Sequence, residues 1–184
     1  MSKNLLICVS CILWFFTKPI FSTQKALETV PYVSLTKYLG KWYEVAKLPN
    51  SFQNKCQYNT TANYSLITGE DLKVVNECRA KEVGAEEKIY KAEGTAWVVD
   101  KISNSKLKVS FVPFLHKLHF WGGDYWIIEL ASDYSYAVVG SKDRKYLWIL
   151  ARTPTLPDQL YDSIISKIKT KGFNVEKIEK SIQK

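Results

Sequence analysis

Short segments rich in Val, Ile, Tyr, Trp and Thr recur at regular intervals between Lys41 and Ala151, and Gly, Asn, Asp and Lys separate them. Strand-sized segments with this spacing are typical of an all-β sandwich or barrel. Compact polar turns such as Thr68-Gly69-Glu70-Asp71 join successive segments, so neighbours in sequence should be antiparallel neighbours in space. The pattern predicts an eight-stranded antiparallel up-and-down barrel with strands at Trp42–Leu48, Tyr58–Leu66, Leu72–Cys78, Lys88–Val99, Lys106–Val112, Asp124–Ala131, Tyr136–Gly140 and Tyr146–Ala151.

The hydrophobic period changes after Arg152. Apolar residues then recur at three- and four-residue steps, preceded by Pro154 and Pro157 and followed by Lys171-Gly172. These features predict one amphipathic α-helix with start and stop signals. Its single apolar stripe should pack on the outside of the barrel, and the last residues of the chain should fray. The stripe consists of Leu156, Leu160, Ile164, Ile165 and Ile168.

Alternation along each strand separates inward-facing from outward-facing side chains. In the second and third strands the even-numbered residues are the more apolar, so they should face inward. The sixth strand is apolar on both faces. There the pattern predicts Trp126, Ile128 and Leu130 inward, with Ile127 covered by the C-terminal helix.

An eight-stranded barrel is either filled by its own side chains or holds one small ligand, and the pattern of residues leaves both readings open. In the second reading, inward-facing apolar and aromatic residues would form the ligand site. Burying an acyl chain there would contribute about 0.8 kcal/mol per CH₂ group. The candidate ligand-binding residues are Tyr64, Val74, Asn76, Trp97, Val109, Phe111, Trp126, Ile128 and Trp148.

Residues 1–22 have the features of an export signal. Lys3 precedes an apolar stretch from Leu5 to Phe16 that is too short to span a bilayer comfortably, and a small residue, Ser22, follows. Cleavage after Ser22 would leave residues 23–184, a length that suits one domain with a substantial core. An alternative is lipidation at Cys11, which would anchor the chain in an outer membrane. We therefore expect an exported protein, either periplasmic and bound to the outer membrane or secreted.

The charge of the chain is mildly basic. The net charge is +8, and removal of the leader with its two lysines lowers it to +6. Such a surface favours solubility and attracts an anionic membrane face or a fatty-acid carboxylate. The chain has no basic helix or aromatic nucleic-acid motif, so nucleic acid is not an expected partner.

Cys56 and Cys78 are the two cysteines of the mature domain. Cys56 precedes the second strand and Cys78 ends the third, and the hairpin between these strands brings the two positions together. In an exported protein such a pair predicts a disulfide, with a contribution on the order of 3 kcal/mol. The alternative is a free thiol that acts as a nucleophile or a metal ligand.

Three motifs carry a resemblance to a known family. Gly40-Lys41-Trp42-Tyr43-Glu44 opens the first strand, Ser132-Asp133-Tyr134 forms a turn, and Arg152 follows the last strand. Together they resemble the lipocalin signature, and the run from Asp143 to Pro154 is similar to bacterial lipocalins of the outer-membrane lipoprotein type and to apolipoprotein D. The resemblance covers the whole mature chain.

The resemblance implies a calyx that binds and transports a fatty acid or a lysophospholipid, with a role in membrane maintenance or stress. It also implies that Trp42 and Arg152 form a structural base, with the guanidinium over the indole. A carrier of a pigment or retinoid-like ligand, and a thiol-dependent enzyme acting on a bound lipid, are the alternatives. We expect a binding protein without enzymatic activity and without a cofactor, as a monomer or homodimer.

The loop from Pro113 to Gly123 should lie at the open end and is unusually apolar for a loop. It is either a lid over the mouth or a portal that touches a membrane, in which Phe114, Leu115, Phe120 and Trp121 would sit at the lipid interface.

The remaining candidate chemistry is sparse. His116 and His119 are the two histidines of the chain, too few for a protein zinc site, so no metal is expected. Asn59 and Asn63 begin glycosylation acceptor patterns with outward parity, which matter only in a eukaryotic secretory pathway.

Overall fold

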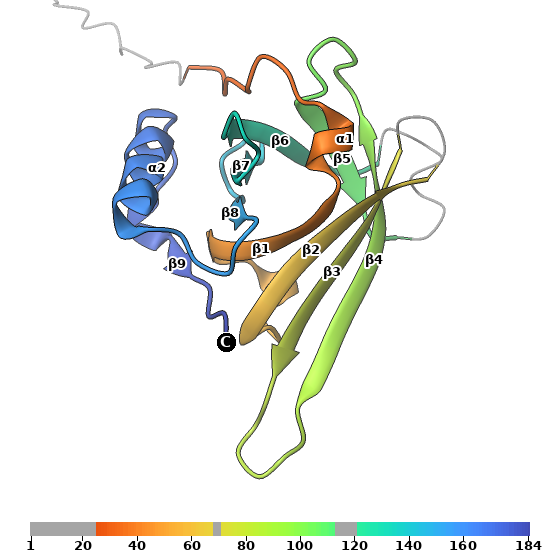
Figure 1. Cartoon of the computed structure of the whole chain (residues 1–184), viewed down its shortest axis with the longest axis vertical. Coiled ribbons are helices and arrows are strands. Elements are labelled where there is room, and N and C mark those ends of the chain that lie inside the picture. Colours follow the sequence, from red (N-terminus) through yellow and green to blue (C-terminus); the bar gives the residue numbers. More distant parts are fainter. Residues whose placement is uncertain (1–24, 68–70, 113–120) are drawn as a thin grey trace, which may run out of the picture.

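The computed structural model describes residues 25–67, 71–112 and 121–184 and shows a β-barrel with a helix beside it (Figure 1). The predicted all-β fold is confirmed. All eight predicted strands are present, and their ends differ from the predicted ones by no more than two residues. They are β1 (Gly40–Lys47), β2 (Tyr58–Leu66), β3 (Leu72–Ala80), β4 (Lys88–Val98), β5 (Lys106–Ser110), β6 (Gly123–Leu130), β7 (Tyr136–Gly140) and β8 (Leu147–Ala151).

Each of these strands pairs with the next along the chain, and β1 pairs with both β8 and β2, which closes the barrel. The closing ladder between β1 and β2 is short: it runs from Gly40 opposite Tyr64 to Tyr43 opposite Thr61. Beyond Tyr43 the two strands separate. The second half of β1 therefore needs another partner for its backbone groups on that side.

The C-terminal segment supplies this partner. The two-residue strand β9 (Glu179–Lys180) follows a 3-10 turn, η3 (Val175–Lys177), and pairs with Ala46 and Lys47 of β1. The Ser181 amide then donates to the Val45 carbonyl at 2.8 Å, and the Asn59 amide of β2 donates to the Ile182 carbonyl at 2.8 Å. The prediction that the last residues fray is wrong, because they fill the seam between β1 and β2.

The N-terminal segment and a short helix, α1 (Leu35–Tyr38), close the end of the barrel where β1 begins. Ser34 caps α1, since its side chain accepts from the Lys37 amide. Upstream, the Val33 amide donates to the Ser103 carbonyl at 2.7 Å. Val33 and Tyr38 are buried, so this end of the barrel is sealed by packed side chains.

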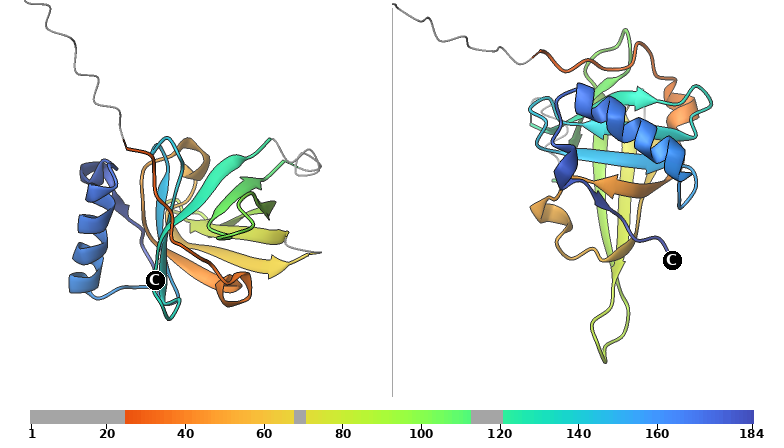
Figure 2. Two further views of the ribbon diagram at one scale, coloured as in Figure 1. Left: turned by 90° about the horizontal axis from the view of Figure 1, so that it is seen from above. Right: turned by 90° about the vertical axis from the view of Figure 1, so that its left-hand side faces the viewer.

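The predicted helix is α2 (Asp158–Thr170), and it lies against the outer face of β7 and β8 (Figure 2). Ile164 and Ile168 are fully buried there among side chains that include Val138 and Ile149. Asp158 in the first turn and Lys167 and Lys169 in the last complement the helix dipole. The helix position confirms the prediction from its apolar stripe.

The barrel therefore has two apolar cores, one inside and one under α2, and β6 contributes to both. Tyr125 and Ile127 belong to the interior core, whereas Ile128 belongs to the core under α2 and Trp126 packs against it. The inward placement predicted for Trp126 and Ile128 is wrong. A register shift between Ile127 and Glu129 inserts one extra residue, after which Leu130 faces the interior as predicted.

Candidate ligand-binding site

Arg152 and Trp42 form the predicted plug at the base of the barrel. The Arg152 guanidinium carbon lies 3.7 Å from the centroid of the Trp42 ring. Its nitrogens also donate to the carbonyls of Lys37, Lys41 and Leu39 at 2.8–2.9 Å, which ties α1 to β1 and β8. Partial burial lowers the pKa of Arg152 from its ordinary value. Gly40 begins β1 beside this contact with a φ of +89°, a backbone conformation that favours glycine.

Three tyrosine hydroxyls form a chain inside the barrel above this plug. The Tyr125 hydroxyl lies 2.8 Å from the Tyr38 hydroxyl and 2.7 Å from the Tyr64 hydroxyl. Tyr64 is on β2 and Tyr125 is on β6, four strands apart in a closed barrel of eight, and therefore on opposite walls. The three rings thus span the interior, and we call them the tyrosine floor.

The tyrosine floor is uncharged at neutral pH. Burial raises the pKa of Tyr64 to about 12, and the pKa values of Tyr38 and Tyr125 lie well above the ordinary value for the same reason. Each hydroxyl keeps its proton, so the chain has three O–H donors for two internal hydrogen bonds. One donor is left over and can serve a ligand that reaches the floor.

The wall above the floor is made of small side chains around Asn76. In the ladder across β2, β3 and β4, Ala62, Asn76 and Ala92 stand side by side on the inner face. Asn76 is partly accessible and Ala92 is exposed. The ladder between β4 and β5 begins at Thr95, so Ala92 lies on the part of β4 that extends beyond it, and water reaches this level of the inner face from the open end.

The structure brings six of the nine predicted ligand-binding residues together on the inner face: Tyr64, Val74, Asn76, Val109, Phe111 and Trp148. The other three are elsewhere. Trp97 pairs with Lys108 on the outer face of β4 and β5, and Trp126 and Ile128 face the helix side. Lys106 Nζ lies 5.0 Å from the Trp126 ring centroid on that outer face. These three positions are not part of the interior.

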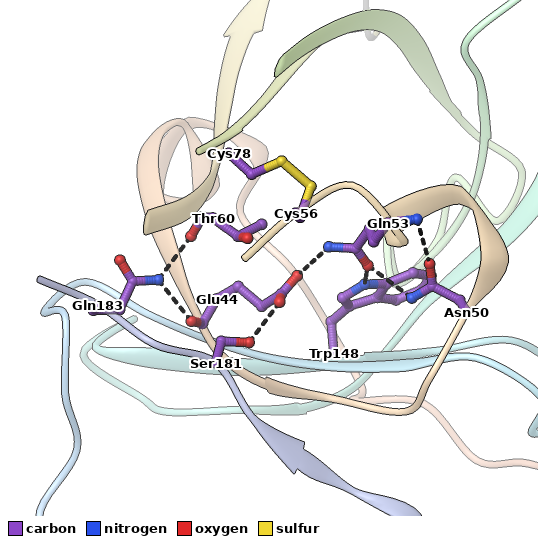
Figure 3. Close-up of a disulfide and its surroundings, with 9 residues drawn as sticks. All are labelled: Glu44, Asn50, Gln53, Cys56, Thr60, Cys78, Trp148, Ser181 and Gln183. Atoms are coloured by element: carbon purple, nitrogen blue, oxygen red, sulfur yellow. Dashed lines mark hydrogen bonds between the residues drawn. A yellow bond between two sulfur atoms is a disulfide. The ribbon is translucent and has the colours of Figure 1, made fainter. Parts of the chain in front are cut away.

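Glu44 is a buried carboxylic acid at the open half of β1, where Figure 3 shows its partners. Gln53 Nε2 donates to one carboxyl oxygen at 2.6 Å and Ser181 Oγ donates to the other at 2.5 Å. Gln53 Oε1 accepts in turn from Trp148 Nε1 at 2.9 Å. The turn η1 (Ser51–Gln53) is thereby held over the inward-facing Trp148.

Cys56 and Cys78 form the predicted disulfide, with their Cα atoms 5.4 Å apart. The bond joins the turn before β2 to the open-end half of β3, beside the Glu44 network (Figure 3). Neither thiol is free, so the free-thiol alternative and the thiol-dependent enzyme derived from it are wrong for these two cysteines.

A polar pocket of about 530 Å³ lies at the open end, next to the disulfide, and it includes Lys47, Asn50, Asn54 and Glu179 in its wall. The Lys47 ammonium lies 3.5 Å from a Glu179 carboxyl oxygen. On the loops of the same end, Phe52 and Trp121 are exposed. Of the predicted portal loop, Phe114, Leu115 and Phe120 lie outside the described residues, as do His116, His119 and Cys11.

Sequence reasoning missed Tyr38, Tyr125, Glu44, Gln53 and the C-terminal residues Ser181 and Gln183. Gln183 Nε2 donates to the carbonyls of Glu44 and Thr60, at 2.8 and 2.9 Å. The acid at position 44 sits two residues after Trp42, on its parity, which was a signal that a carboxyl group faces inward. The two asparagines of the glycosylation acceptor patterns have different surroundings. Asn59 Oδ1 accepts a hydrogen bond from the Lys184 amide, whereas Asn63 is exposed.

A closed antiparallel barrel with one sealed end and one open end defines the class of small-ligand-binding β-barrels. Within this class the sequence identifies the family. The family model described as "Lipocalin-like domain" matches residues 33–183, and the chain belongs to the lipocalin family.

Several relatives are similar over most of their length. The chain is 34% identical to temperature-induced lipocalin-1 of Arabidopsis thaliana, covering 87% of this chain and 84% of that protein. It is 35% identical to the outer membrane lipoprotein Blc of Vibrio cholerae (84% and 85% covered) and 32% identical to apolipoprotein D of Mus musculus (77% and 72%). The predicted resemblance to bacterial lipocalins and apolipoprotein D is confirmed.

Solved structures share the fold at low identity. The cockroach allergen Per a 4 aligns with a TM-score of 0.62 and 15% identity, over 88% of this chain and 96% of that one. Insecticyanin from the tobacco hornworm aligns with a TM-score of 0.62 and 18% identity, over 85% and 84%. At these identities the likeness supports the barrel alone.

Family membership supports binding and transport of a small hydrophobic ligand. In the described ranges, no helix has the length and apolar character that a membrane crossing requires. Over the same ranges, His, Cys, Asp and Glu side chains form no group of three or more suited to a metal ion.

Proposed function

We propose that this protein carries a fatty acid or a lysophospholipid, with the acyl chain inside the barrel and the polar head at the open end. The observation that carries the proposal is the inner face above the tyrosine floor, where Asn76 and Ala92 are accessible although they face inward. Each CH₂ group buried against this wall contributes about 0.8 kcal/mol.

The polar head would lie in the pocket beside Lys47, Asn50 and Asn54. The Lys47 ammonium and the two amides can donate hydrogen bonds to a carboxylate or a phosphate. Lys47 is the positively charged residue among those that form the wall of the pocket. The exposed aromatic side chains of Phe52 and Trp121 are suited to contact with the lipid interface, so delivery at a membrane surface is part of the proposal.

We further propose export, by cleavage after Ser22 or by lipidation at Cys11, with a role in membrane maintenance or stress. The similarity to the outer membrane lipoprotein Blc supports an outer-membrane or periplasmic location. Mass determination of the protein purified from its own host distinguishes a cleaved chain from a lipidated one.

Displacement of an apolar fluorophore by oleate and by lysophosphatidylcholine tests the ligand directly. Stoichiometric displacement by either lipid supports the proposal, and an absence of displacement by both would sink it. Replacing Ala92 by Trp fills the inner face and should weaken lipid binding at least tenfold. The control Lys91→Trp adds the same ring to the exposed outer face of the same strand and should leave affinity unchanged.

A further inference from the structure

Asn76 carries a hydrogen-bonding group that nothing in the described residues satisfies. Its Oδ1 atom is buried and has no hydrogen-bond partner. Its place in the ladder between Ala62 and Ala92 puts the side chain on the inner face, and other atoms of the residue are partly accessible. A buried polar group without a partner is costly, so the amide is poised for a group that enters from the interior.

The neighbours of Asn76 explain why no protein group meets it. Across the ladder stand the methyl groups of Ala62 and Ala92, and along β3 stand Val74 and the disulfide-bonded Cys78. None of these side chains donates a strong hydrogen bond. An amide in an otherwise apolar wall matches sites in which a few polar groups select the ligand.

The charges around this level disfavour an anion. Glu44 is buried in the same half of the barrel. On the described strands, the inward-facing lysines are Lys47 and Lys88, and both stand at the open-end tips of their strands. Lys55 Nζ lies 5.8 Å from the ring centroid of Tyr90, which is also nearer the open end than Asn76. A carboxylate at the depth of Asn76 would therefore lose its hydration without meeting a cation. An uncharged group would not incur this cost.

We propose that Asn76 selects ligands that bring an uncharged hydrogen-bonding group, a hydroxyl or a carbonyl, to the middle of the barrel. The amide accepts from a hydroxyl through Oδ1 or donates to a carbonyl through Nδ2, since a half-turn about χ2 exchanges the two atoms. The tyrosine floor, with one O–H donor left over, is a second contact for an oxygen that reaches deeper. This inference rests on the proposed function and narrows its ligand to one whose acyl chain carries an uncharged oxygen-containing group at the depth of Asn76.

The test compares methyl stearate with the positional isomers of methyl hydroxystearate, which differ only in a hydroxyl along the chain. Fluorophore displacement is measured on the wild type, on Asn76→Leu and on the control Asn63→Leu, which changes an exposed residue on the outer face of β2. We expect Asn76→Leu to weaken at least one hydroxylated isomer about tenfold relative to methyl stearate, which corresponds to about 1.4 kcal/mol. The control should leave this ratio unchanged.

Two outcomes separate the inference from the proposed function. If Asn76→Leu changes every isomer and methyl stearate by the same factor, the selective role of Asn76 is wrong while lipid binding stands. If no lipid displaces the fluorophore from the wild type, the lipid-carrier function itself is wrong. Asn76→Asp adds a further check, because a second carboxyl group should weaken oleate more than methyl oleate.

Discussion

The hydroxyls of Tyr64 and Tyr125 lie 2.7 Å apart although their strands, β2 and β6, stand on opposite walls of the barrel. Two side chains that meet across the full width leave no open channel at their level. Ligand space is therefore confined to the half of the barrel between this contact and the open end, and the base below it is a packed core.

Removing the central hydroxyl should destabilise the fold. Tyr125→Phe leaves the buried hydroxyls of Tyr38 and Tyr64 without their shared partner, at an expected cost of about 1–3 kcal/mol. Urea unfolding measures the change. Tyr32→Phe, at a position 60% exposed, is the matched control and should change the free energy of unfolding little. Equal stability of both variants would show that the three-hydroxyl chain does not form.

The tyrosine floor also predicts a loss of stability in alkali. The folded pKa of Tyr64, about 12, is above the ordinary value of 10.0, and burial also raises the pKa values of Tyr38 and Tyr125 well above 10.0. A raised folded pKa means that the unfolded chain releases these protons first, so stability is complete below about pH 10 and falls above it. In an absorbance titration of the eleven tyrosines, three should ionise only as the protein unfolds. Full ionisation in the folded state would contradict this.

Arg152→Lys should weaken the base despite conserving the charge. Lysine lacks the planar fork that donates to the carbonyls of Lys37, Leu39 and Lys41 while stacking on Trp42. We expect a loss of about 2–3 kcal/mol in chemical unfolding. Arg79→Lys, which changes an exposed ion pair with Glu87, should cost far less. If Arg152→Lys were as stable as the wild type, the positive charge alone would be enough to stabilise the base.

The disulfide should stabilise the chain without being required for the fold. Replacing both Cys56 and Cys78 by Ser opens a loop of 22 residues and should cost about 3 kcal/mol. Thermal unfolding with and without reductant gives the same comparison in the unmodified protein. Reductant should lower the midpoint of the wild type and leave that of the double variant unchanged.

Gln53 links Glu44 to Trp148, so Gln53→Leu should be read out by tryptophan fluorescence. The change removes a donor to the buried carboxyl group and the acceptor of the indole N–H. We expect about 1–3 kcal/mol of destabilisation and a shifted emission maximum. Gln57→Leu, which removes an exposed contact with the Lys81 amide, should leave the spectrum unaltered. An unchanged spectrum in both would show that the turn does not hold the indole.

Local sequence patterns predicted the strands well because each strand carries its own alternation. Tyr58–Leu66 and Tyr136–Gly140 match the structure residue for residue. Alternation misassigned β6, since both of its faces are apolar and the extra residue at Ile128 leaves no trace in the sequence. Side-chain size was also a misleading guide. Trp97 and Trp126 are large and apolar, yet both lie on the outer face of the barrel.

The polar part of the site was beyond sequence reasoning for a different reason. Tyr125 is 87 residues from Tyr38 and 61 residues from Tyr64 in the sequence. No local sequence pattern indicates which distant residue a tyrosine hydroxyl will contact. The tail from Ser181 to Lys184 is held by backbone and amide contacts with β1 and β2. Such contacts depend on the gap left by a short ladder, and that gap exists only once the barrel has closed.

Because of the single additional residue in β6, this strand contributes side chains both to the interior core and to the core under α2. Replacements at Ile128 would change the core under α2, whereas replacements at Tyr125 or Ile127, one to three positions away, would change the interior core of the barrel. The barrel interior and the docking of α2 can therefore diverge separately in evolution, although the residues that form them are nearly adjacent in the gene.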